Sequence, residues 1–100
     1  MGSFLIPPEQ IYLTPHARQR MLERHILLHE VQIVLSFGKV IVDYPTDTPY
    51  PSRLICHIGA MRPLHVVSAT DPISGHELVI TVCEPDPARW IAPDFEERYK

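Results

Sequence analysis

The spacing of apolar residues changes near residue 38, and this change does most to limit the possible folds. Before that point, apolar residues recur at three- and four-residue intervals, which predicts helices over 15–24 and 28–37. After it, apolar and polar residues alternate, which predicts strands over 40–44, 53–58, 63–69 and 76–83. A further short strand is predicted at 11–14. The sequence therefore predicts an α+β fold, with two helices packed on one face of an antiparallel sheet of about four strands.

Local signals support these boundaries. Thr14 is a typical helix N-cap, and Pro15 suits the first helical position because that position needs no backbone N–H. Gly38 is expected to end the second helix. Three prolines within 45–51 exclude the interior of a strand there, so this segment is predicted to be a loop. Residues 59–60 are predicted to form a tight turn between two strands.

The length of 100 residues fits one domain. We expect a flexible lead-in over 1–10, a single α+β domain over 11–90 and a C-terminal tail over 91–100 with one helical turn near 94–99. No apolar run approaches the roughly 20 residues of a transmembrane helix. The N-terminus also lacks the basic and apolar regions of a secretory signal, so a cytoplasmic protein is expected.

The cysteines and histidines give no strong sign of a metal site. Cys56 and Cys83 each lie within an apolar stretch, without a C-x-x-C pair, and are expected to be reduced and buried. His25 and His29 are four residues apart, but His25 is expected in the turn between the helices. The sequence has neither an H-E-x-x-H motif nor Cys/His spacing typical of zinc sites, so no metal or cofactor is predicted.

The first predicted helix carries a basic stripe. His16, Arg20 and Arg24 follow one another at four-residue intervals and so lie on one side of that helix, beside its apolar stripe. In one interpretation they border the core and pair with acidic neighbours, for which the candidates are Glu23, Glu30, Asp43 and Glu84. In the other, the stripe and a facing strand form one basic pocket.

The faces of the sheet depend on the loop between the second and third predicted strands of the alternating region. With an even loop, Arg53, His57 and Arg62 share one face, which is polar enough to bind a ligand. The opposite face, which includes His65, would then be core against the helices. An odd loop or a β-bulge would instead place His57 with His65. The sequence leaves both arrangements open.

Two further groups each allow a structural and a functional interpretation. His65 is either a buried, hydrogen-bonded structural residue or a general acid or base, because its ordinary pKa lies near neutrality. After the last strand, Arg89 and Asp86 are expected to pair across a turn while Trp90 fills an edge of the core. Alternatively, Glu84 and Asp86 form an acidic ledge for a partner protein.

Several motifs occur together in one order: "LTPHARQRMLER", "VIVDYPTDTPYPSRL", "PLHVV" and "VITVCEPDPARW". Through them the chain resembles the bacterial domain-of-unknown-function family numbered 4258 over about residues 12–90. Two positions depart from that family's pattern: His25 stands where glycine is usual, and His29 replaces an acidic residue. The element order of the family is similar to that of RelE/ParE-like toxins.

The resemblance implies a toxin that cleaves mRNA without a metal ion and is controlled by an antitoxin protein, some antitoxins of this kind having a small zinc finger. Cleavage needs a base, an acid and cations around the phosphate. From the residues themselves, we assign His16 and His65 to proton transfer, and Arg20 and Arg53 to the phosphate. The residues expected to bind RNA are Arg24, Tyr44, Tyr50 and His57.

The alternative hypothesis is a non-catalytic protein-binding module of the same RelE-like fold, whose basic stripe binds an acidic segment of a partner. The net charge of −3 argues against a protein that coats nucleic acid non-specifically. An exposed edge strand at 40–44 predicts a homodimer.

Overall fold

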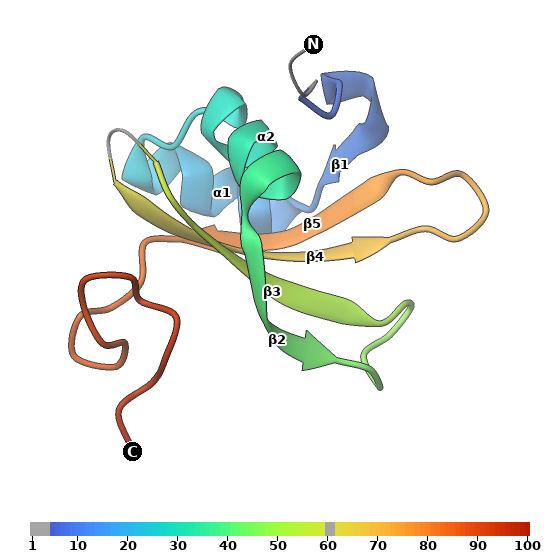
Figure 1. The fold of residues 1–100 in the computed structure, drawn as a ribbon. Helices are drawn as coiled ribbons and strands as arrows, with labels where there is room; N and C mark the ends of the chain where they lie inside the picture. Colours follow the sequence, from blue (N-terminus) through green and yellow to red (C-terminus); the bar gives the residue numbers. More distant parts are fainter. Residues whose placement is uncertain (1–4, 60–61) are drawn as a thin grey trace, which may run out of the picture.

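The computed structural model describes residues 5–59 and 62–100 and places two helices on a five-stranded sheet (Figure 1). The helices are α1 (Pro15–Arg24) and α2 (Leu28–Phe37), and they have the predicted bounds. The strands are β1 (Ile11–Leu13), β2 (Lys39–Tyr44), β3 (Ser52–Ile58), β4 (Pro63–Thr70) and β5 (Glu77–Cys83). Each strand lies within one residue of its predicted bounds at both ends. The α+β class is therefore confirmed.

The prediction of about four antiparallel strands is wrong, because β1 joins the sheet as a fifth strand. The order across the sheet is β1-β5-β4-β3-β2, and β1 runs parallel to β5 with Ile11 opposite Glu77. The other pairs are antiparallel. A parallel pair needs a long crossover connection, and here both helices and three strands separate β1 from β5 in the chain.

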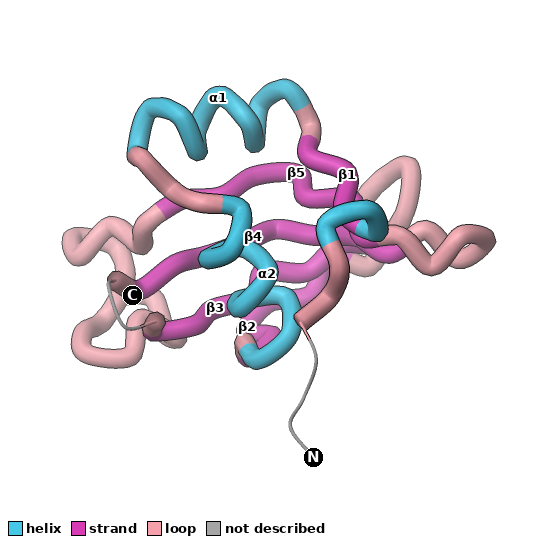
Figure 2. Tube along the Cα trace, turned by 90° about the horizontal axis from the view of Figure 1, so that it is seen from above, coloured by secondary structure: helices cyan, strands magenta, loops and turns pink. Residues whose placement is uncertain are grey.

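Both helices lie on the same face of the sheet, as predicted (Figure 2). Helix α1 packs mainly on β5, whereas α2 packs on β3 and β4. The core between the two layers consists of buried apolar side chains from every one of these elements: Ala17, Met21, Ile26, Val31, Val34, Ile55, Leu64, Val66, Val79 and Val82. Within the described residues, no helix is both long and apolar enough to cross a membrane.

The assignment of the sheet faces is reversed relative to the sequence-based expectation. Ile55 lies opposite Val66, and both belong to the core under the helices. The face that carries Arg53 and His57 is therefore the face that the helices cover. The loop is even, as one alternative required, because Ile58 lies opposite Pro63. The predicted turn at 59–60 itself lies partly outside the described residues.

The helix ends follow local chemistry. Thr14 Oγ1 accepts a hydrogen bond from the Ala17 amide at 3.1 Å, which confirms the predicted N-cap. His25 ends α1 in the left-handed region with φ of 54°, a conformation that glycine adopts more easily. Gly38 ends α2 in an extended conformation, and a Cβ there would lie 2.5 Å from both Ile55 Cγ2 and the Val34 carbonyl oxygen. Close packing, rather than a left-handed turn, requires glycine at Gly38.

Residues 84–100, called the C-terminal segment below, follow β5 and contact the sheet face that the helices leave uncovered. The Cys56 thiol donates to the Asp94 carbonyl oxygen at 3.4 Å, and Lys39 pairs with Glu96 at 2.8 Å. The helical turn predicted near 94–99 is wrong, since this region forms turns and a single bridge between Trp90 and Arg98. At the other end, the expected lead-in contains a 3₁₀ helix over Pro8–Gln10, and its residues 1–4 lie outside the described part.

Candidate functional site

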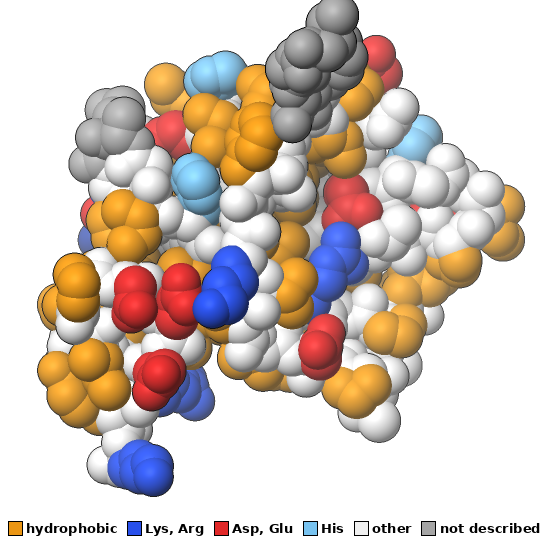
Figure 3. Space-filling model, viewed as in Figure 1, with side chains coloured by type: hydrophobic (Ala, Val, Ile, Leu, Met, Phe, Trp, Pro, Cys, Tyr) orange, Lys and Arg blue, Asp and Glu red, His pale blue; other side chains and the backbone are white. Residues whose placement is uncertain are grey.

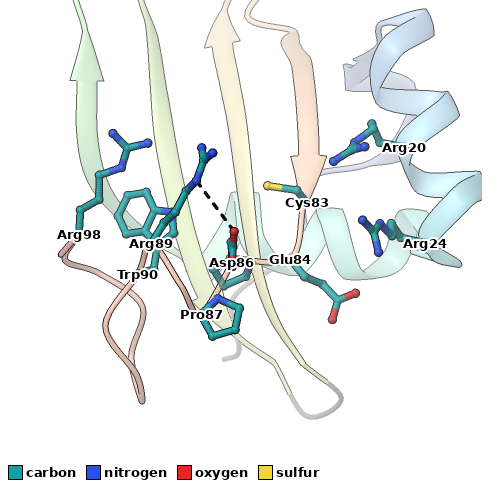
Figure 4. A pocket seen from close by; sticks show the side chains of 10 residues that line it. Arg20, Arg24, Cys83, Glu84, Asp86, Pro87, Arg89, Trp90 and Arg98 are labelled. Carbon is teal, nitrogen blue, oxygen red and sulfur yellow. Dashed lines mark ion pairs between the residues drawn. The ribbon is translucent and has the colours of Figure 1, made fainter.

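A hollow of about 600 Å³ lies where β5 ends, between α1 and the C-terminal segment (Figure 4). We call it the arginine pocket. Four of its ten lining residues are arginines, and the side chains of Arg20 and Arg24 point from α1 toward the end of β5 in Figure 4. The complete lining is Arg20, Arg24, Cys83, Glu84, Pro85, Asp86, Pro87, Arg89, Trp90 and Arg98.

The pocket is locally basic although the chain is acidic overall. Its four arginines face only two carboxylates, those of Glu84 and Asp86, whereas the whole chain has a net charge of −3. The ion pair of Arg89 with Asp86 is long, at 3.9 Å, and both side chains are exposed. On the face shown in Figure 3, by contrast, Lys and Arg side chains are scattered among Asp and Glu. The arginine pocket is therefore suited to an anion.

Helix geometry explains how α1 contributes two arginines to one place. Ala17 and Met21 are buried in the core, four residues apart on the inner side of the helix. Arg20 lies about 100° around the helix from Met21, and Arg24 lies about 60° from Met21 on the same side, so both border the inner face. Arg20 also approaches Glu23 at 3.8 Å, an exposed pair that contributes little stability. Arg20 and Arg24 of the predicted basic stripe thus form one wall of the pocket, without His16.

The opposite wall depends on His65 and Trp90. The two rings meet edge to face with centroids 4.6 Å apart, and both side chains are buried. His65 Nε2 donates to the Phe95 carbonyl oxygen at 2.9 Å, which holds the C-terminal segment against β4. The Arg98 guanidinium lies over the Trp90 ring at 5.1 Å, within the range of a cation–π interaction. His65 therefore positions the wall that carries Arg89 and Arg98.

Lowering the pH should destabilise the protein through His65. Burial lowers the pKa of His65 below its ordinary value of 6.5, although the bond to Phe95 opposes this effect. The unfolded chain then binds a proton near pH 6.5 that the folded chain binds only at lower pH, so the free energy of unfolding falls as pH drops below about 6.5. Urea unfolding followed by Trp90 fluorescence at pH 7.5 and 5.5 measures the loss. His65→Gln, which keeps a donor for Phe95, should show a smaller loss, and an equal loss would contradict this assignment.

The cysteines do not supply a reactive thiolate. Cys56 and Cys83 lie opposite His65 on its two neighbouring strands, so their Cα atoms are roughly 10 Å apart, beyond the reach of a disulfide. Both are free. Burial raises the pKa of the Cys83 thiol although Arg20 and Arg24 lower it, and burial raises that of Cys56 to about 11. The prediction of free thiols is confirmed, but that of burial holds only for Cys56, because Cys83 is partly buried and lines the pocket in its neutral form.

Arg53, predicted to bind phosphate with Arg20, lies at the other end of the sheet. Its guanidinium pairs with Glu77 Oε1 at 2.7 Å, and the hydroxyls of Ser68 and Thr70 donate to the same carboxylate. Glu77 begins β5 whereas Cys83 ends it, so about 20 Å of strand separates this cluster from the arginine pocket. The expected single pocket formed by the basic stripe and a facing strand is therefore not present.

The remaining predicted site residues are dispersed. His16 is exposed in the first turn of α1 and does not line the arginine pocket. Tyr44 lines a shallow hollow beside Asp47 and Ser52. Tyr50 is half-buried in the loop between β2 and β3, and His57 lines an apolar hollow near α2. Of the eight predicted residues, the structure brings only Arg20 and Arg24 together at the pocket, with His65 behind its wall.

Sequence reasoning missed Arg89 and Arg98 as partners of the α1 arginines. The pairing of Arg89 with Asp86 and the burial of Trp90 were predicted and are confirmed. Those two features could have indicated that Arg89 lies near the sheet, because a buried Trp90 brings the residues beside it close to the strands. The sequence did not show which end of the sheet Trp90 would reach.

Across 5–59 and 62–100, no three His, Cys, Asp or Glu side chains gather closely enough to bind a metal ion. Comparison with protein families matches residues 13–84 to the family described as "Domain of unknown function (DUF4258)". This match includes α1, both helix arginines and Glu84, whereas Arg89 and Arg98 lie beyond it. No curated protein and no solved structure matches the chain.

Proposed function

The chain belongs to the DUF4258 family, and from this premise we propose that it is the toxin component of a toxin–antitoxin pair, an endoribonuclease that cleaves mRNA. The description of the family assigns no activity, so the proposal depends on the arginine pocket. The observation that carries it is the convergence of four arginines from two separate parts of the chain on one hollow. Arginine forms bidentate hydrogen bonds with phosphate, and such groups stabilise the charge of a phosphoryl transition state.

Glu84 supplies the proton acceptor in this proposal. It lies in the pocket at the end of β5, and its side chain is 45% exposed, so an RNA 2′-hydroxyl can reach it. Glu84 removes the proton of the 2′-hydroxyl, whose oxygen then attacks the adjacent phosphorus. The bond from phosphorus to the 5′-oxygen breaks, which leaves a 2′,3′-cyclic phosphate, and the departing 5′-oxygen takes a proton from water. The arginines hold the phosphate oxygens during this step.

The proposed roles of His16 and His65 change accordingly. His65 is buried and its Nε2 donates to Phe95, so it acts by positioning Trp90 rather than by proton transfer. His16 is one turn before Arg20 and outside the pocket lining. Because arginines provide the positive charge around the phosphate, cleavage is expected to continue in EDTA.

Glu84→Gln should lower the rate of RNA cleavage by about 100-fold or more, since loss of a general base usually has an effect of this size. The measurement is cleavage of a mixed-sequence RNA in EDTA, with product ends analysed for cyclic phosphate. Glu23→Gln is a matched control, because Glu23 is an exposed carboxylate that approaches Arg20 without lining the pocket. Equal activity of wild type and Glu84→Gln would contradict the role of Glu84, and intact RNA with wild type would contradict the proposed activity.

A second candidate function is a protein-binding module, favoured by the exposed edge of the sheet. β2 is the last strand in the sheet order, and Val40 and Tyr44 on it are 45% and 40% exposed. An apolar edge strand can pair with a strand of another chain, either an antitoxin or a second copy. Growth arrest on expression, relieved by co-expression of a neighbouring antitoxin gene, favours the toxin. Stable complex formation without growth arrest or RNA cleavage favours the module.

The proposed setting is the cytoplasm, where mRNA is available. The proposed partners are RNA at the arginine pocket and an antitoxin protein elsewhere on the surface. Both follow from the proposed activity and from the mRNA-cleaving toxins that the element order resembles.

A further inference from the structure

A second hollow of about 330 Å³ adjoins the arginine pocket and shares two of its arginines. Ala88, Arg89, Arg98 and Tyr99 line it. Arg89 and Arg98 therefore lie between the two hollows and belong to both. A basic surface thus continues from α1, past the end of β5, to the last residues of the chain.

Tyr99 presents an exposed aromatic ring at the far end of this surface. Tyr99 is 58% exposed, so its ring is accessible to a ligand in the second hollow. Its backbone is held in place, because the Tyr99 amide donates to the Arg89 carbonyl oxygen at 3.0 Å. The Ile91 amide also donates to the Glu97 carbonyl oxygen at 2.8 Å, and Trp90 bridges Arg98. The two short stretches 89–91 and 97–99 therefore form a paired support that fixes Tyr99 beside Arg89.

We infer that the two hollows form one track for single-stranded RNA, in which Arg89 and Arg98 hold a phosphate between them and the Tyr99 ring stacks on a base. This inference rests on the proposed function, because it assumes that the arginine pocket holds the reacting phosphate. It adds the selection of single strands and the path of the strand, which runs between Arg20 and Arg24 at one end and Tyr99 at the other.

Stacking on Tyr99 is the step that selects a single strand. An aromatic side chain stacks on the open face of a base, and every base has such a face, so this contact tolerates any sequence. In a duplex the base faces are covered by neighbouring bases, and only edges and backbone remain accessible. The arginines and the tyrosine ring beside them provide the two contacts that single strands offer, to phosphates and to base faces.

The experiment is fluorescence anisotropy of a labelled single-stranded RNA whose 2′-hydroxyls are methylated, so that binding is measured without cleavage. Tyr99→Ala should weaken binding about 5- to 100-fold, the range expected for loss of one stacked base. Tyr99→Phe should bind like wild type, because it keeps the ring. Tyr12→Ala is a matched control, since Tyr12 on β1 is 55% exposed, lines neither hollow and lies opposite Leu78, about 16 Å of strand before Cys83. The blunt duplex of the same sequence should bind more weakly than the single strand.

The outcomes separate this inference from the proposed function. If Tyr99→Ala binds as tightly as wild type while loss of Arg20 and Arg24 abolishes binding, the track is wrong and the arginine pocket still binds RNA. Duplex binding as tight as single-strand binding also overturns the track. If wild type binds no RNA, both the track and the proposed function fail.

Discussion

Replacing Arg20 and Arg24 together with alanine is expected to weaken binding of single-stranded RNA by about 100-fold or more. Both side chains point from α1 into the arginine pocket, where the phosphate is proposed to lie (Figure 4). Each hydrogen bond to a charged group contributes about 1.5–3 kcal/mol, and every 1.4 kcal/mol changes affinity about tenfold. The double variant should also show a weaker dependence of binding on salt, because it releases fewer counterions. Anisotropy titrations at several salt concentrations measure both effects.

Arg18→Ala is the matched control for this variant. Arg18 is on the same helix and is exposed, but its Nε donates to the Leu13 carbonyl oxygen on the opposite side from the pocket. We expect near wild-type binding for Arg18→Ala. A comparable loss in Arg18→Ala would indicate a general charge effect, and unchanged binding in the double variant would remove the arginine pocket as the RNA site.

Replacing Glu77 with alanine is expected to lower the free energy of unfolding by about 3 kcal/mol, the lower end of the range for breaking a buried ion pair. Glu77 is 8% exposed and accepts hydrogen bonds from Arg53, Ser68 and Thr70. Without the carboxylate, the half-buried Arg53 guanidinium and the fully buried Ser68 hydroxyl each lose a hydrogen-bond acceptor. For a domain of this size, the melting temperature should fall by more than about 10 °C. Circular dichroism during heating measures the change.

Two comparison variants test the cause of this loss. Glu96→Gln removes an ion pair of similar length, that of Glu96 with Lys39, but the Lys39 side chain is 69% exposed, so the melting temperature should stay close to wild type. Glu77→Leu combined with Arg53→Met removes both charges and should recover much of the stability lost in Glu77→Ala. A melting temperature for Glu77→Ala equal to that of Glu96→Gln would contradict a structural role for this cluster.

The Arg20/Arg24 and Glu77 variants also distinguish a binding role at one end of the sheet from a structural role at the other. Arg53 was predicted to hold phosphate, yet it lies in the Glu77 cluster about 20 Å of strand away from Cys83. A loss of growth arrest in Arg53→Ala would therefore be expected to follow from lost folding stability. Arg20 and Arg24 variants should remain folded and lose RNA binding alone.

The helices were predictable because their signals are local. The apolar spacing, together with Thr14 and Pro15, fixed the start of α1, and the change of period fixed the end of α2. The place of β1 was not predictable in this way. Its pairing with β5 joins residues 66 positions apart, such as Ile11 and Glu77. The sequence of the three residues of β1 does not indicate which strand they pair with.

The face of the sheet that the helices cover could not be read from polarity. Ile55, Leu64 and Val66 occupy one face, but Leu54 and Cys56 make the other face equally apolar. Alternation shows which residues share a face and does not show which layer covers it. The C-terminal segment buries part of the second face, and for this reason both faces needed apolar residues.

Half of the candidate site was predictable. Four-residue spacing placed Arg20 and Arg24 on one side of a helix, and the structure confirms that they share a pocket. Arg89 and Arg98 reach the same pocket through contacts distant in sequence, above all that of His65 with Trp90 at 4.6 Å. Irregular segments of this kind have no period from which their path can be predicted.

The most direct test of the central claim is an NMR titration of isotopically labelled protein with the methylated single-stranded RNA. We predict the largest shifts at the backbone amides of Cys83, Glu84, Asp86 and residues 88–90, at the side chains of Arg20 and Arg24, and at the indole N–H of Trp90. Shifts centred on Arg53 and Glu77, or along β2, would place the binding surface elsewhere and contradict the assignment of the arginine pocket as the RNA site.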